Sequence, residues 1–174
     1  LEFFGHDDVH VLNGGFNAWA AADLPTTQDA TIPKAGNFKM KPRAERLATA
    51  EEVQSKLGNP SVVIVDTRSD AEYTGQLVRA KRGGAIPGAV HLEWTNNLDP
   101  KGFFKSAEQL REMYEQRKIT PDKEIIPHCQ GAYRSAHTYL ALRLIGYPNV
   151  KNYLGSWGEW GNRLDLPIEH PTKP

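Results

Sequence analysis

The sequence is poor in cysteine, has no excess of charge of either sign and contains no long apolar run. Cys129 is the single cysteine among 174 residues, so no internal disulfide forms and the fold does not depend on an oxidising compartment. Basic and acidic residues each number 21, and this balance argues against nucleic acid or an anionic membrane as a partner. No apolar stretch approaches roughly 18 residues, the length that crosses a bilayer.

Metal-binding and targeting patterns are also missing. No spacing of histidine and cysteine is typical of a metal site, and no signal peptide is visible, so we expect a cytoplasmic protein without a bound metal. The 39% apolar and 24% charged residues are typical of a soluble globular protein. The length suits one ordinary domain, or one domain with additional segments.

Two similar segments stand near the two ends of the chain. In VHVLNGGFNAWAAADLP (9–25) and VKNYLGSWGEWGNRLDLP (150–167) a glycine and two aromatic residues coincide, and a final D-L-P follows after a slip of one residue. Each copy is typical of a short strand, a glycine turn, a short helix and a proline stop. Because the second copy closes a domain, we expect residues 1–25 to be the tail of a preceding domain. Residues 26–45, with two prolines and little periodicity, are then an interdomain linker.

Predicted strands and helices alternate through residues 46–174. Capping boxes of the type Ser/Thr-x-x-Glu/Gln predict helices that begin after Thr49, Ser69 and Ser106. Strands are predicted at 62–65, at 89–92 and from 124 toward Cys129, and a helix at 134–145 has an apolar face of Ala136, Leu140, Ala141 and Leu144. This alternation predicts an α/β fold, an open parallel sheet with helices on both faces. Pro127 lacks a backbone N–H, so we expect it at the last position of its strand.

The segment HCQGAYRS (128–135) places the cysteine at a strand end, followed by a loop and a helix start. Open α/β sheets bind ligands at the carboxyl ends of their strands. Backbone N–H groups of the loop would surround the sulfur of Cys129, and the positive end of the helix dipole would point toward it. Gly131 would ease the tight curvature of the loop, and Arg134 would add a permanent positive charge. These features favour a thiolate that attacks an electrophilic sulfur or phosphorus. The alternatives are a phosphatase-type loop and a buried cysteine with only a packing role.

Four segments, in order, resemble the rhodanese family of sulfurtransferases, specifically the second, catalytic domain of the two-domain thiosulfate and 3-mercaptopyruvate sulfurtransferases. They are VDTRSDAEYTG (65–75), GGAIPGAVHLEW (83–94), HCQGAYRS (128–135) and YLGSWGEWGNRLDLP (153–167). The segment at 9–25 resembles the end of the first, inactive domain of that family. The resemblance implies a rhodanese-like fold, a tandem repeat, and contact between residues 46–174, the catalytic domain, and the rest of a first domain.

The resemblance also implies a double-displacement reaction that needs no cofactor. Cys129 as a thiolate would attack the outer sulfur of thiosulfate and expel sulfite, and the Cys129 persulfide would pass its sulfur to cyanide, a small thiol or a protein thiol. Related phosphatases have one more residue between Cys and Arg than the four of this loop (130–133), which disfavours a phosphatase. Arg134 favours thiosulfate as the donor. The alternatives are 3-mercaptopyruvate as the donor, and a persulfide carrier that delivers sulfur to a protein partner.

The same resemblance suggests roles for residues around Cys129. Arg68 occupies the substrate-binding position of Asp-x-Arg in the family, although an ion pair with a helix residue explains it equally well. Gln130 and Tyr133 are predicted to line the mouth of the substrate pocket, and Gly131 and Ala132 complete the binding loop. His128 is predicted to be structural, because adjacent residues of a strand point to opposite faces. Scaffold roles are predicted for Glu72, Trp157 and Trp160, and a solvated surface position for Arg82.

Overall fold

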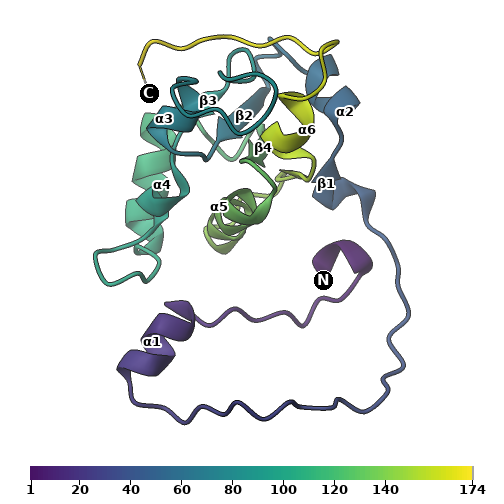
Figure 1. The fold of residues 1–174 in the computed structure, drawn as a ribbon, viewed down its shortest axis with the longest axis vertical. Helices are drawn as coiled ribbons and strands as arrows, with labels where there is room; N and C mark the ends of the chain where they lie inside the picture. The colour runs from purple at the N-terminus through teal and green to yellow at the C-terminus, as the bar shows by residue number, and fades with distance from the viewer. Residues whose placement is uncertain (174) are drawn as a thin grey trace.

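The computed structural model describes residues 1–173, which form an α/β body with an N-terminal arch beside it (Figure 1). Pro174, the last residue of the predicted catalytic domain, lies outside the described residues. The central sheet is parallel, in the order β3 (Val90–His91), β2 (Val62–Asp66), β4 (Glu124–His128). A second parallel pair joins β1 (Leu47–Ala48) to β5 (Asn152–Tyr153), and a parallel bridge from Ile125 to Val150 connects it to β4. The predicted open parallel sheet is confirmed.

Helices cover both faces of this sheet. They are α2 (Ala50–Ser55), α3 (Asp70–Tyr73), α4 (Ala107–Gln116), α5 (Tyr133–Leu144) and α6 (Ser156–Trp160), with a short 3₁₀ turn at Trp94–Asn97. Ile64 of β2 belongs to an apolar cluster with residues of α2 and α6, whereas Val63 and Val65 belong to a cluster with residues of α4 and α5. Ile126 and Ile125 of β4 divide in the same way. Because successive residues of a strand face opposite sides, the apolar runs of these strands are buried on both faces.

Two of the three predicted capping boxes form completely. Ser69 and Ser106 each accept the N–H group of the residue three positions on, and the side chains of Glu72 and Gln109 accept the serine N–H in return. Thr49 accepts the N–H of Glu52 at 3.2 Å, but the reciprocal bond is missing, so the third capping box was predicted wrongly. The carboxylate of Glu52 instead binds two lysine ammonium groups, Lys56 at 2.6 Å and Lys151 at 2.5 Å, which are stronger donors than a neutral amide.

Pro127 lies inside β4, one residue before its end, and not at the last position that we predicted. It pairs with Val65 of β2. The N–H of Ile125 donates away from β2, to the carbonyl of Asn149 at 2.8 Å. Residues two apart in a strand direct their N–H groups to the same side, and the bridge toward β5 involves Ile125 alone. The missing N–H of Pro127 therefore costs no bond to β2, which explains how proline is accommodated in a buried strand.

The buried face of α5 differs from the apolar face that we predicted. Its fully buried residues are Ser135, Thr138, Ala141 and Leu142, whereas Ala136 and Leu144 are exposed. The inner polar side chains are satisfied: the Ser135 hydroxyl donates to the carbonyl of Ala132 at 3.1 Å, and the Asn97 amide donates to the Thr138 hydroxyl at 3.2 Å. The apolar stripe of Ala136, Leu140 and Leu144 is therefore turned away from the core, toward the N-terminal arch.

The N-terminal arch contains α1 (Gly15–Ala21) and two 3₁₀ turns at Glu2–Phe4 and Ala44–Arg46, and residues 26–43 contain neither helix nor strand. The two similar sequence segments share local geometry. Gly15 and Ser156, at matching positions, both have positive φ angles of 59° and 52°. The indole N–H of Trp19 donates to the carbonyl of Pro25 at 3.0 Å, and that of Trp160 donates to the carbonyl of Pro167 at 2.7 Å.

The two similar segments differ in how deeply they are buried. Phe16 is 69% exposed, whereas its counterpart Trp157 is 1% exposed. Residues 9–12 are not paired as a strand, whereas the counterpart region contains β5. Among residues 1–173 no helix is both long and apolar enough to cross a membrane.

Candidate active site

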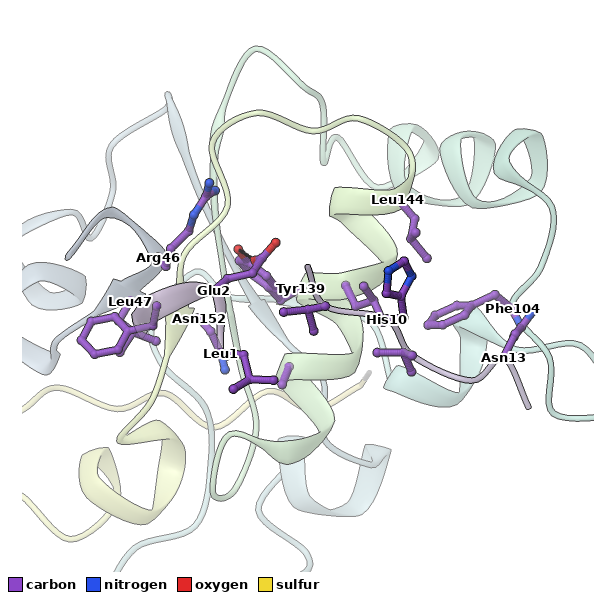
Figure 2. A pocket seen from close by; sticks show the side chains of 15 residues that line it. Leu1, Glu2, His10, Asn13, Arg46, Leu47, Phe104, Tyr139, Leu144 and Asn152 are labelled. Atoms are coloured by element: carbon purple, nitrogen blue, oxygen red, sulfur yellow. Dashed lines mark hydrogen bonds between the residues drawn. The ribbon is translucent and has the colours of Figure 1, made fainter. Parts of the chain in front are cut away.

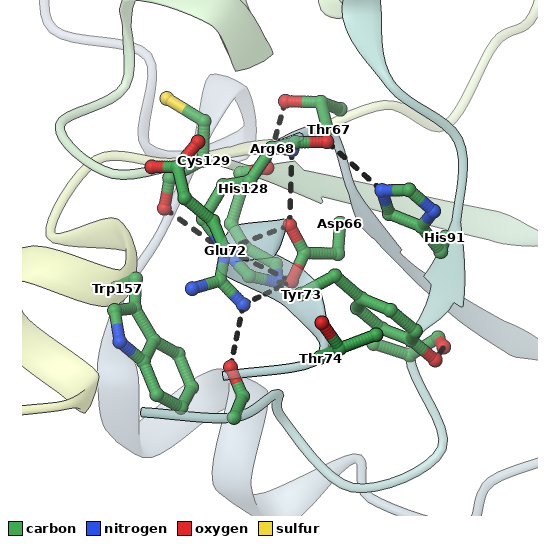
Figure 3. Close-up of polar contacts among 12 residues, drawn as sticks. Asp66, Thr67, Arg68, Glu72, Tyr73, Thr74, His91, His128, Cys129 and Trp157 are labelled. Carbon is green, nitrogen blue, oxygen red and sulfur yellow. Dashed lines mark hydrogen bonds and ion pairs between the residues drawn. The ribbon is translucent and has the colours of Figure 1, made fainter. Parts of the chain in front are cut away.

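Cys129 follows the carboxyl end of β4 (Figure 3), and the loop that it begins leads into the first turn of α5, which contains Tyr133 and Arg134. Cys129 is 1% exposed. The first residues of α6 fix this loop through hydrogen bonds to its backbone. The hydroxyl of Ser156 accepts the N–H of Cys129 at 3.2 Å, and the N–H groups of Trp157 and Gly158 donate to the carbonyls of Cys129 and Gln130, both at 2.8 Å. The sulfur atom is therefore carried by a backbone that is fixed at both ends.

The surroundings of Cys129 favour its thiolate. Burial raises the pKa of the thiol, but hydrogen bonds from the backbone N–H groups of Ser135, Gly131 and Arg134 outweigh burial and bring the pKa below its ordinary value. Backbone N–H groups of the loop and of the start of α5 thus favour the ionised sulfur. Ser135 was not among the predicted site residues. Its position directly after Arg134 in HCQGAYRS was the signal that could have identified it.

The tight curvature of the loop falls on Ala132 and not on Gly131. Ala132 has a φ of 68°, in the left-handed region, and is the N-cap of α5. Gly131 does not have a positive φ, is exposed, and a Cβ at this position would meet no atom within 4 Å. The prediction that Gly131 eases the curvature was therefore wrong. The loop holds an alanine in a conformation that costs L residues about 1–2 kcal/mol. Hydrogen bonds from α5 to the carbonyl of Ala132 offset this strain.

Arg134 is held by a buried carboxylate beneath the loop. Its two terminal nitrogens donate to the two oxygens of Glu72, at 2.6 and 2.9 Å. The pKa of Arg134 is raised, chiefly by its bonds to Glu72 and further by the nearby Cys129. Glu72 belongs to α3, where it also closes the capping box with Ser69. The scaffold role that we predicted for Glu72 therefore includes fixing the cation beside the reactive sulfur.

Glu72 makes a contribution to stability that should depend on pH. Burial raises its pKa, but hydrogen bonds from Arg134 and Ser69 lower it further, to about 2. A carboxyl whose pKa falls on folding stabilises the protein above its unfolded pKa, and this stabilisation is lost as pH falls through the folded value. We expect Glu72→Gln to lower the free energy of unfolding at pH 7 by about 1–3 kcal/mol, and the difference from wild type to disappear between pH 4.5 and 2. Urea unfolding over this pH range measures it.

The matched control for this experiment is Glu112→Gln, which changes an exposed carboxylate of α4. Its free energy of unfolding should stay within about 0.5 kcal/mol of wild type at every pH. A difference between wild type and Glu72→Gln that did not change with pH would show that the loss has another origin than the ionised carboxylate.

Arg68 lies below the loop and is fully enclosed, unlike the substrate-binding arginine that we predicted. It is 1% exposed, its Nε donates to the Asp66 carboxylate at 2.9 Å, and a terminal nitrogen donates to the carbonyl of Gly84 at 2.7 Å (Figure 3). Its guanidinium carbon lies 4.4 Å from the centre of the Trp157 ring. Arg68 therefore forms an ion pair, the alternative to substrate binding given above. Its partner is Asp66, two residues away, and not a helix residue.

Tyr133 and Gln130 lie at the rim of the loop, whereas His128, the last residue of β4, lies in the interior. Tyr133 is 89% exposed, so its side chain stands in solvent beside the loop. The Gln130 amide donates to the backbone carbonyl of Arg79 at 3.1 Å, which ties the rim to the segment after α3. His128 is fully buried, and burial lowers its pKa although Asp66 raises it. Its enclosed position is consistent with the structural role that we predicted. Within residues 1–173, no group of three or more His, Cys, Asp or Glu side chains is placed to hold a metal ion.

Comparison with known proteins identifies the family of this chain. The profile of the rhodanese-like domain matches residues 49–163. The chain belongs to the rhodanese-like family. A thiosulfate sulfurtransferase of Azotobacter vinelandii is 43% identical over 97% of this chain, and one of Pseudomonas aeruginosa is 41% identical over the same share. The sulfur carrier protein TtuD of Thermus thermophilus is 39% identical over 97% of the chain. The chain spans only 62% of the length of the first two proteins and 64% of the third.

Solved structures of the protein EanB have a similar fold. A variant of EanB in complex with ergothioneine superposes with a TM-score of 0.90 at 25% identity, covering 99% of this chain and 44% of EanB. Another EanB variant, captured as a cysteine persulfide in a tetrahedral intermediate state with ergothioneine, superposes with a TM-score of 0.88 at 26% identity, covering 98% and 43% of the two chains. A persulfide on cysteine is therefore an intermediate of that structural relative.

Proposed function

We propose that this rhodanese-like domain is a thiosulfate sulfurtransferase that works through a persulfide on Cys129. The observation that carries the proposal is the placement of Cys129: its thiol is buried at the carboxyl end of β4, in a loop fixed by hydrogen bonds to α6, where backbone N–H groups lower its pKa. The names of the relatives in Azotobacter and Pseudomonas support thiosulfate as the donor. We also propose a cytoplasmic location, where an unpaired cysteine stays reduced.

The proposed reaction has two displacements on sulfur. The thiolate of Cys129 attacks the outer sulfur of thiosulfate, a new S–S bond forms, and the old S–S bond breaks with its electron pair leaving on sulfite. The terminal sulfur of the persulfide carries the negative charge, which the loop N–H groups and Arg134 stabilise. In the second step cyanide or a thiolate attacks this terminal sulfur, and Cys129 leaves as the thiolate. Both steps conserve charge and need no cofactor.

Mass spectrometry of the intact protein tests the proposal. After incubation with thiosulfate and removal of excess reagent, the chain should gain the mass of one sulfur atom and lose it again on addition of cyanide. Uptake of sulfur from 3-mercaptopyruvate but not from thiosulfate would identify the donor as the mercapto acid. Absence of an adduct with either donor would overturn the proposal.

A persulfide carrier that donates to another protein is the second candidate. Tyr133 supports it, because an aromatic side chain that is 89% exposed beside the loop is suited to contact with a partner protein. The similarity to a protein named a sulfur carrier points the same way. An enzyme should turn over thiosulfate and cyanide many times, whereas a carrier should accept one sulfur and discharge it slowly to small acceptors.

We also propose that residues 1–25 are the C-terminal part of a preceding rhodanese-like domain, joined through a linker at 26–45. The shared tryptophan–proline contacts and the exposure of Phe16 support this. Between the arch and α5 lies a hollow of about 640 Å³, lined by Leu1, Val9 and Val11 and by Ala136, Leu140 and Leu144 (Figure 2). The rest of that domain would cover this apolar lining, since an unpartnered apolar surface is costly in water.

The domain proposal predicts that Phe16 contributes little to the stability of residues 46–173. Because Phe16 packs outside the α/β body, we expect Phe16→Ala to change the free energy of unfolding by less than about 0.5 kcal/mol in urea. Leu110→Ala, in the core of the body, is the positive control and should be destabilising by about 2–5 kcal/mol. A loss above about 1 kcal/mol for Phe16→Ala would place this segment in the same cooperative unit and contradict the proposal.

A further inference from the structure

The arginines near the reactive loop differ in how far their charge is already neutralised. Arg68 is enclosed with Asp66, and Arg134 is bonded to both oxygens of Glu72. Arg82, which we predicted to be a solvated surface residue, instead donates to carbonyls at the end of α6, including those of Trp160 at 3.0 Å and Leu166 at 2.9 Å. None of these three side chains presents an uncommitted guanidinium to an incoming molecule.

Arg79 differs from these three. Its side chain is 57% exposed, and across residues 1–173 its one anionic partner is Glu72, with Nε 3.4 Å from an oxygen that Arg134 already occupies. Its backbone carbonyl accepts the hydrogen bond of Gln130, the residue that follows Cys129. Arg79 therefore stands at the rim of the loop, with its charge only partly neutralised and its terminal nitrogens accessible to solvent.

The charges beside Cys129 would make such a cation favourable for the approach of an anionic donor. The thiolate and Glu72 carry two negative charges, and Arg134 supplies one positive charge, so this group is left with one net negative charge. Thiosulfate is a dianion, and its approach to this group is repulsive unless another cation is close. Adding the charge of Arg79 makes the net charge of the thiolate, Glu72 and the two arginines zero. The planar guanidinium of Arg79 can bind two oxygens of the thiosulfate at once.

We infer that Arg79 is a donor-specificity residue, which binds the charged oxygens of the sulfur donor while its outer sulfur reaches Cys129. This inference rests on the proposed sulfurtransferase function. It assigns donor binding to the segment after α3, and it leaves Arg134 to hold the thiolate and the persulfide.

The test measures the two half-reactions separately in Arg79→Gln, whose amide can still donate to Glu72 but carries no charge. We expect the KM for thiosulfate to rise about tenfold, with little change in the maximal rate of sulfite release. Discharge of the preloaded persulfide to dithiothreitol, a neutral acceptor, should proceed at the wild-type rate. Arg79→Lys should recover most of the donor affinity, and the rise of KM with salt should be weaker in Arg79→Gln than in wild type.

Lys81→Gln is the matched control, because it removes an exposed cation two residues away whose backbone N–H binds Asn162. It should leave both half-reactions unchanged. Arg79→Gln with wild-type KM for thiosulfate would overturn the inference while the sulfurtransferase function stood. Equal losses in loading and discharge would also overturn it, since they would indicate a structural role through Glu72. Failure of the wild type to acquire sulfur would overturn the proposed function and the inference together.

Discussion

Cys129→Ser should abolish sulfur uptake from thiosulfate and lower the rate of thiocyanate formation by about 10³-fold or more. A serine hydroxyl is far less nucleophilic than a thiolate, and the lowered pKa of Cys129 increases the fraction of thiolate at a given pH. Intact mass after incubation with thiosulfate and a cyanide-coupled assay give two independent readouts.

Circular dichroism and urea unfolding are the controls for this variant. Ser and Cys are similar in size, so the fold should be retained, and hydrogen bonds to Ser156 and from Trp157 use only the backbone of residue 129. A folded Cys129→Ser protein that still formed thiocyanate from thiosulfate at the wild-type rate would show that the reaction does not pass through a persulfide on this residue.

Asp66→Ala should destabilise the protein by about 3–5 kcal/mol at pH 7. Asp66 is fully buried and Arg68 is 1% exposed, so removing the carboxylate leaves a guanidinium without its counter-ion inside the protein. Burial raises the pKa of Asp66, but His128 and Arg68 lower it to below its ordinary value. The stabilisation by Asp66 is thus present above the unfolded pKa of about 3.9 and is lost as pH falls below it, so the deficit of Asp66→Ala should shrink in acid.

The exposed pair of Asp165 and Arg163 provides the control. Their atoms approach to 2.7 Å, yet the Asp165 side chain is largely in solvent, so Asp165→Ala should leave the free energy of unfolding close to that of wild type. Urea unfolding of both variants at pH 7 compares them directly. A loss below about 1 kcal/mol for Asp66→Ala would mean that Arg68 gains another partner or reaches solvent, and that the enclosed pair is not needed for the fold.

The parts of this site that could be predicted from sequence are those set by local pattern. The strand before Cys129, the loop to Arg134 and the helix after it follow from apolar runs, loop composition and helix periodicity over neighbouring residues. The capping boxes at Ser69 and Ser106 likewise depend on residues three apart, and both form. The capping box at Thr49 failed because Lys151, distant in sequence, competes for Glu52.

Positions that depend on contacts between distant segments could not be predicted in the same way. The apolar stripe of α5 has a regular helical spacing, yet Asn97 and the Cys129 loop turn the opposite, partly polar face inward. The curvature was assigned to Gly131 by residue type, whereas Ala132 carries the positive φ, because the bonds from α5 to its carbonyl hold it there.

By itself the sequence determined the α/β fold and the family, and it singled out Cys129 as the proposed nucleophile, since each depends on periodicity or on ordered motifs along the chain. Only the tertiary structure decided what each arginine does. Arg68, Arg82 and Arg134 each found their partners among carboxylates and carbonyls, and Arg79 remained largely in solvent at the rim. The physical reason is that the role of a charge depends on its burial and on the opposite charges within a few ångströms, and folding alone brings those groups together.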